Sequence, residues 1–318
     1  DSFFVAQISE DAMTAISLVF PMQNFINSVM IGFGIGINSV ISFYMGAQDK
    51  VQADKAASQG ILLATIHGIV MTAGCIMLIK PFLCMFTNDS SIVELGLQYS
   101  YIAFAFSTIL AWQLVFEKTF QAVGRMTASM TAMLGGCITN IVLDPMLIFG
   151  IGIFPDLGIR GAAIATGIGQ TVSLLVYVII YILRPIPVRF TRKCMKLEKT
   201  LCLKMYSVGI PASLNMALPS LLISALNVIL AAFSQTYVFV LGVYYKLQTF
   251  LYLPANGVVQ GMRPLIGYNY GAGEHKRVKK IYSTATIIVL IIMCAGTAIC
   301  LGIPDKLIGL FTTNANTI

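Results

Sequence analysis

The chain has 318 residues, of which 57% are hydrophobic and only 10% are charged, and its mean hydropathy is +0.84. These values exclude a soluble globular domain and predict an integral membrane protein. The formal net charge of +7 would suit a nucleic-acid partner only if the basic residues formed a patch.

Eight apolar runs are long enough to cross a bilayer as helices, which takes about 20 residues each. They are continuous and lack the alternation of a transmembrane barrel, so we predict an all-α fold. Sixteen Lys and Arg residues fall on one side of these spans and only Lys80, Arg160 and Lys306 on the other. The positive-inside rule assigns the basic side to the cytoplasm, and no nucleic-acid partner is expected. The predicted spans are 12–38, 57–80, 92–117, 126–150, 159–183, 207–233, 236–264 and 280–303.

The segment 23–55 recurs 225 residues later as 248–280, with 8 identities in 33 positions. Two complete units would need about 450 residues, so we expect a fragment of a longer protein. The polar stretch 184–206 is predicted to be a cytoplasmic linker between an N-terminal bundle, 1–183, and a partial C-terminal bundle, 207–318. Both copies of the turn, FYMGAQDK and YNYGAGEHK, lie on the basic side, so the repeat is parallel, as in transporters that move one bundle against the other.

Motifs for metal or nucleotide chemistry are absent from the sequence. The seven cysteines form no CxxC pair, and His67 and His275 stand apart from each other. The glycines of GFGIG, at 32–36, lie inside an apolar span and follow no strand, and no Walker-type loop occurs. We therefore expect no metal or organic cofactor, and an ion gradient rather than ATP as the energy source.

Asp144 is the one acidic residue that the sequence places deep in a span, where a carboxylate is costly and is by default a functional candidate. Asn140 lies four residues earlier, on the same helix face. Pro145 has no N–H and leaves a carbonyl oxygen without its helical donor. Such a group of oxygens can hold a sodium ion, and the carboxylate can also bind a proton. The alternative is a buried polar pair that only fixes helix packing.

Lys246 is a second charge at membrane depth, about 15 Å along its helix. We predict that it faces a substrate cavity, to which Gln23, Gln113 and Gln248 would add polar contacts. The alternatives for Lys246 are a structural ion pair and a side chain that snorkels to the membrane surface.

Four segments together resemble the MATE family of multidrug and toxic compound extrusion transporters: TNIVLDPMLIFG at 139–150, GIRGAAIAT at 158–166, KLQTF at 246–250 with GMRPLIGYNYGAGEHKRVKK at 261–280, and the opening DSFFVAQISEDAMTAIS. The resemblance implies a twelve-helix plan of two bundles, of which this chain would lack the first helix and the last three. It also implies a cation site built from Asp1, Asn140, Asp144 and Thr166. For Thr166 the alternative is a packing role, with its hydroxyl bonded to a backbone carbonyl.

The resemblance implies a monomeric antiporter in the cytoplasmic (inner) membrane that exports drugs or toxic organic cations in exchange for protons or sodium ions, and not an enzyme. Its partners would be the lipid bilayer and a small organic molecule. Two alternatives share this architecture: a flippase or exporter of lipid-linked compounds or metabolites, and an inactive remnant. A membrane enzyme or receptor would need a catalytic cluster or a signalling domain, and the sequence shows neither.

Overall fold

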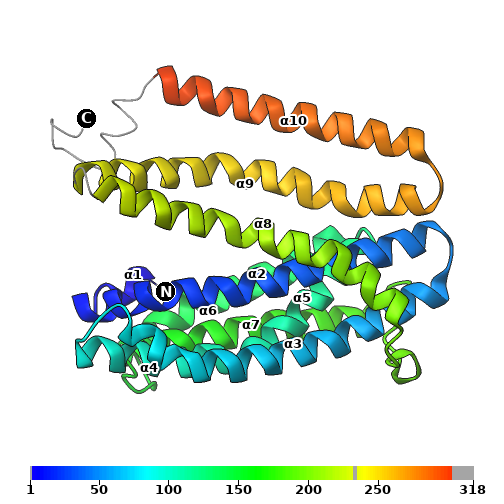
Figure 1. Ribbon diagram of the computed structural model, residues 1–318. Coiled ribbons are helices and arrows are strands. Elements are labelled where there is room, and N and C mark those ends of the chain that lie inside the picture. Colours follow the sequence, from blue (N-terminus) through cyan, green and yellow to red (C-terminus); the bar gives the residue numbers. More distant parts are fainter. Residues whose placement is uncertain (1, 232–234, 303–318) are drawn as a thin grey trace. The chain divides into compact units, whose positions relative to one another are not determined.

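The structure is a computed structural model that describes residues 2–231 and 235–302, without some of the side chains between 220 and 250. Every regular element in these ranges is a helix, which confirms the predicted all-α fold (Figure 1). The chain divides into two compact units, residues 1–217 and 218–318, which are described separately. The predicted bundles, 1–183 and 207–318, stay a prediction.

The helices of the described ranges follow one another with short connections (Figure 1). They are α1 (Ser2–Val5), α2 (Glu10–Gly46), α3 (Lys50–Cys84), α4 (Ser90–Ala105), α5 (Ser107–Ala122), α6 (Met126–Ile148), α7 (Ile159–Leu183), the 3-10 helix η1 (Arg192–Cys194), α8 (Lys199–Ala231), α9 (Gln235–Gly271) and α10 (His275–Gly302). Among the described residues, α2, α3, α6, α7 and α10 are each long and apolar enough to cross a membrane.

The predicted span at 92–117 is divided in the structure into α4 and α5, which meet at an angle of 43°. Together they make a sixth possible span. The Thr72 hydroxyl on α3 donates to the Phe104 carbonyl at 2.9 Å, just before the break. Gly167 on α7 leaves room for the Phe106 ring, which a Cβ at that position would overlap. Contacts from neighbouring helices therefore favour a bend that no proline or glycine marks in the sequence.

The two copies of the repeated turn have the same backbone structure. Gln48 has a φ of 60° and its repeat equivalent, Gly273, a φ of 74°. The next residue in each turn donates its N–H across the turn at 2.9 Å, Asp49 to the Tyr44 carbonyl and Glu274 to the Asn269 carbonyl. Matching hydrogen bonds at equivalent positions support the internal repeat that the sequence indicates.

In the first unit, the amino-terminal part of α8 packs closely on α2. A Cβ at Gly36 would collide with the Met205 carbonyl, and one at Gly32 would collide with Ser213. The segment before α8 is fixed to α3, because Gln59 donates to the Lys196 carbonyl at 2.7 Å and accepts from the Glu198 N–H at 3.2 Å. Small residues thus let two membrane helices approach closely, as is usual in membrane bundles.

In the second unit, α9 and α10 lie antiparallel to each other (Figure 1). Leu251 packs directly on Gly296, because a Cβ at Gly296 would lie 2.6 Å from a methyl carbon of Leu251.

Candidate functional site

The centre of the candidate site is on α6, close to its carboxyl end. Asp144 is buried, with 1% of its surface exposed, and Asn140 lies one turn earlier. Pro145 is within the helix, which continues to Ile148. The sequence therefore places an amide and a carboxylate on one face of α6, as predicted.

The structure brings three of the four predicted cation-site residues together. The Asn140 amide nitrogen donates to the Asp144 carboxylate at 3.3 Å and lies 3.4 Å from the Thr166 hydroxyl on α7. The Thr166 hydroxyl donates in turn to the Ala162 carbonyl at 3.0 Å. The backbone bond of Thr166 fits the packing alternative, but its oxygen still has lone pairs for a cation. Carboxylate, amide and hydroxyl groups therefore meet inside the first unit, and such oxygens suit a small cation.

Close packing of α6 on α7 makes this meeting possible. At Gly136 a Cβ would collide with the Ser173 hydroxyl and lie 2.5 Å from the Gly169 carbonyl oxygen. A Cβ at Gly169 would lie 3.1 Å from that of Asn140. Ser173 is buried, and its hydroxyl donates across to the Ala132 carbonyl at 2.9 Å. The glycines thus hold Asn140 within reach of α7.

The other predicted site residues are scattered or lie outside the described part. Asp1 and the side chain of Lys246 are outside the described residues. Gln23 is half-buried, and its amide donates to the hydroxyl of the buried Tyr99 at 3.4 Å, so it contacts the interior of the first unit. Gln113 on α5 is half-buried, and its carbonyl oxygen has no hydrogen-bond partner among the described residues. Gln248 is half-buried on α9 of the second unit.

Glu117 and Lys118, on α5, are buried charges that the sequence reasoning misses. We expected Asp144 to be the only deep acid and Lys118 to belong to the cytoplasmic side, and neither expectation foresaw a charged pair buried inside the helix bundle. The two residues are 5% and 4% exposed, and the Lys118 ammonium lies 2.8 Å from the Glu117 carboxylate. Their position at the end of a predicted span gave no sign of burial. The adjacent opposite charges, with Gln121 one turn later, were the available signal.

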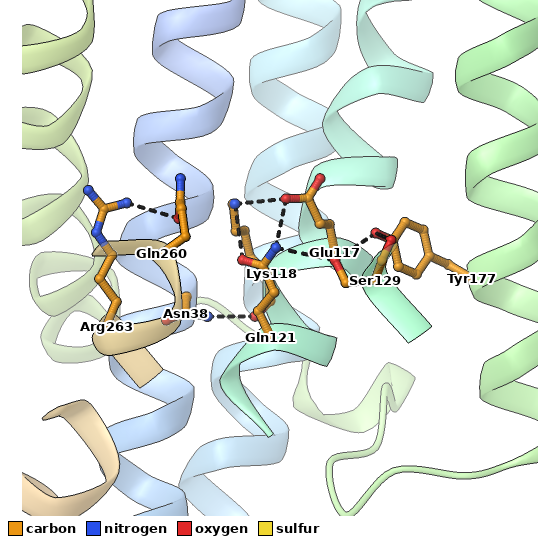
Figure 2. Close-up of polar contacts among 8 residues, drawn as sticks. All are labelled: Asn38, Glu117, Lys118, Gln121, Ser129, Tyr177, Gln260 and Arg263. Atoms are coloured by element: carbon orange, nitrogen blue, oxygen red, sulfur yellow. Dashed lines mark hydrogen bonds and ion pairs between the residues drawn. The ribbon is translucent and has the colours of Figure 1, made fainter. Parts of the chain in front are cut away.

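Figure 2 shows how this pair joins three further helices. The Gln121 amide donates to Glu117 at 3.0 Å and to the Ser129 hydroxyl of α6 at 3.2 Å. The Ser129 hydroxyl lies 3.1 Å from that of Tyr177 on α7. On the other side, the Asn38 amide of α2 donates to the Lys118 carbonyl at 2.9 Å. Such a network can hold a buried ion pair, because each charge has additional hydrogen bonds.

The second unit has a half-buried cation well inside a long helix. Arg263 on α9 is half-buried, and its guanidinium donates to the Gln260 side chain at 3.2 Å (Figure 2). Gly271 ends the helix eight residues later, so Arg263 lies about 12 Å inside that end. The sequence reasoning assigned this residue to the basic, cytoplasmic side, although it falls near the end of the predicted span 236–264.

Comparisons with known proteins agree with this fold. A model of the MatE family matches residues 1–146 and 211–318. The multidrug export protein MepA of Staphylococcus saprophyticus is 26% identical over 314 residues, which cover 98% of this chain and 68% of that protein. The FAD transporter of Shewanella oneidensis is 26% identical over 280 residues, covering 88% of this chain and 62% of that protein. The solved structure of an outward-facing multidrug resistance MATE family transporter matches with a TM-score of 0.91 at 25% identity, and the match covers 99% of this chain and 70% of that one.

A helical fold that crosses the membrane several times, with a buried carboxylate inside it, defines a multi-pass membrane protein of the transporter class. The chain belongs to the MatE family, because the family model matches well over half of it. This confirms the resemblance drawn from the sequence. The protein is therefore a transporter of the cell membrane and not an enzyme.

Proposed function

We propose that the protein is a cation-coupled antiporter that exports organic drugs or toxic organic cations. The observation that carries this proposal is the cluster of Asp144, Asn140 and Thr166 in the interior of the first unit. A carboxylate inside a membrane bundle is by default a functional candidate, and a carboxylate can bind a proton or a sodium ion. Asp1 would be a further member of this site by family resemblance.

Coupling requires that the cation and the substrate favour different conformations. A cation that reaches Asp144 from outside would remove its negative charge and change the hydrogen bond from Asn140. Because Asn140 also contacts Thr166, this change would alter the contact between α6 and α7. Release of the substrate outward and return of the cation inward would then complete the cycle.

The names of the relatives support a small-molecule substrate. MepA is a multidrug export protein, and this chain matches it along 98% of its length. We propose a substrate cavity with contributions from Gln23, Gln113, Lys246 and Gln248, and a monomer as the working unit in the bilayer. Amide side chains and the aromatic and Met residues of the chain would suit varied ligands.

The second candidate is an exporter of an anionic metabolite, and two observations favour it. One relative is an FAD transporter. In the second unit, Arg263 is a half-buried cation on α9, and the sequence from 199 to 273 contains no Asp or Glu. Positive charge without acidic partners suits an anionic substrate.

The test is transport by the protein, in its full natural length, after reconstitution in liposomes. Efflux of a fluorescent organic cation would be followed under an imposed proton gradient, an imposed sodium gradient and no gradient. The proposal expects efflux under one of the two gradients and little without. Gradient-independent behaviour would refute cation coupling, and transport of flavin nucleotides but not of organic cations would favour the second candidate.

A further inference from the structure

A small basic hollow lies between the start of α6 and the end of α7. It has a volume of about 390 Å³ and is lined by Arg125, Thr127, Ala128, Thr131, Ile180, Leu183 and Arg184. Polar and cationic groups form one part of its wall and aliphatic side chains the other. The hollow is thus amphipathic and positively charged, and it has no part in the cation site around Asp144.

The two arginines of the hollow have different surroundings. The Arg125 guanidinium donates to the carbonyls of residues 184 and 185, at 3.2 and 3.5 Å, and so is fixed in place with donors to spare. Arg184 is exposed, and its guanidinium has no ion-pair partner in the described part of the chain. No acidic side chain lines the hollow. The hollow therefore has a positive charge that would attract an anion.

Apolar surface continues from the hollow along both helices. Leu134 on α6 and Leu175, Ile179 and Leu183 on α7 are between 51% and 74% exposed, which is the expected state of side chains that face lipid tails. Arg125 and Arg184 lie where this apolar surface ends. By the positive-inside rule this end of the helices is the cytoplasmic one, so the hollow lies at the level of the inner-leaflet headgroups.

We propose that this hollow binds the phosphate headgroup of an anionic phospholipid of the inner leaflet. Basic pockets between membrane helices on the cytoplasmic side are known to select such headgroups. The guanidinium groups of Arg125 and Arg184 would contact the phosphate through charge-assisted hydrogen bonds. The acyl chains would lie along Leu134, Leu175 and Ile179. A phospholipid fits better than a dissolved phosphate ion, because only a lipid would also cover the apolar wall.

The proposed lipid would bind beside the first turns of α6, which also take part in the buried network of the first unit. The Thr131 hydroxyl, in the wall, donates to the Thr127 carbonyl, and the same first turns of α6 contribute Ser129 to the buried network around Glu117. A bound headgroup would therefore hold the start of α6 against the end of α7. It would stabilise the first unit without contact with the cation site.

Arg184→Glu is the variant that tests the site, because Arg184 is exposed and its replacement leaves the contacts of Arg125 in place. Arg192→Glu is the matched control, with the same change of charge at an exposed arginine of the linker that lies outside the hollow. The measurement is the thermal unfolding midpoint of the purified protein in detergent. It is recorded during titration with phosphatidylglycerol, with phosphatidylcholine and with inorganic phosphate.

We expect phosphatidylglycerol to raise the midpoint of the wild-type protein and of Arg192→Glu at similar concentrations, and to act on Arg184→Glu only at concentrations about tenfold higher. Phosphatidylcholine and inorganic phosphate should have little effect. An equal response of all three proteins to phosphatidylglycerol would overturn the proposal in favour of a general attraction to basic surface. An equal effect of phosphatidylcholine, or a full effect of inorganic phosphate, would also overturn it.

Discussion

Gly136→Ala should loosen the helix pair that carries the candidate cation site, whereas Gly135→Ala should not. A Cβ at Gly136 would lie 2.5 Å from the Gly169 carbonyl oxygen and would collide with the Ser173 hydroxyl. A Cβ at Gly135 would meet only a methyl group of Val176, at an ordinary 3.8 Å. The backbone carbonyl cannot rotate away as a flexible side chain could, so α6 and α7 must separate in the first variant only.

The size of the effect follows from comparing the two variants. Each replaces a helical glycine by alanine and gains about 1 kcal/mol of helix propensity, which cancels in the difference. Overpacking at a close contact costs about 1–3 kcal/mol. For a unit of roughly 200 residues, each kcal/mol shifts the unfolding midpoint by about 2–4 °C. We therefore expect Gly136→Ala to unfold about 2–12 °C below Gly135→Ala.

The assay is thermal unfolding of the purified variants in detergent, followed by gradient-driven transport in liposomes. Since Asn140 lies one turn from Gly136 and 3.4 Å from Thr166, separation of the helices should also impair transport in Gly136→Ala. Equal midpoints and equal transport in the two variants would refute the argument that this glycine sets the geometry of the site.

Three further predictions concern other contacts. Lys118→Met should destabilise the protein by about 3–5 kcal/mol, because it leaves a buried carboxylate unpaired. Combining it with Glu117→Gln should recover most of that stability in thermal unfolding. A double variant as unstable as the single one would contradict this. Gly36→Val should displace the start of α8 and speed proteolysis of the linker, and Gly74→Val, with nothing within 4 Å, should not; equal cleavage of both would speak against the packing argument. Lys55→Gln should leave the unfolding free energy nearly unchanged, since its ion pair with Glu198 is partly exposed; a large loss of stability in denaturant titration would contradict this.

Much of the fold could be predicted from the sequence because apolar runs and positive charges are local signals. Within the described residues, each predicted span coincides with a helix or, at 92–117, with a bent pair. The bend itself was not predictable, because it depends on Thr72 and Gly167 from other helices and not on a breaker in the span.

In the candidate site, too, local sequence spacing predicted one contact, whereas the others depend on helix packing. Asn140 and Asp144 share a helix face through their spacing of four residues, and the structure shows their contact. Thr166 came from family resemblance, and its contact with Asn140 depends on helix packing that periodicity cannot give. Glu117 and Lys118 went unnoticed because a charged pair at the end of a span normally lies at the membrane surface, and their burial depends on Gln121 and Ser129.

The most direct test of the central claim is gradient-driven efflux of a fluorescent organic cation from liposomes that contain Asp144→Asn, with Asp156→Asn as the control. Asp156 is an exposed aspartate in the loop after α6, so the control makes the same chemical change outside the buried cluster. The cation-coupled mechanism predicts that Asp144→Asn folds but loses gradient-driven efflux, while Asp156→Asn transports like the wild-type protein. Undiminished gradient-driven efflux by Asp144→Asn would contradict it.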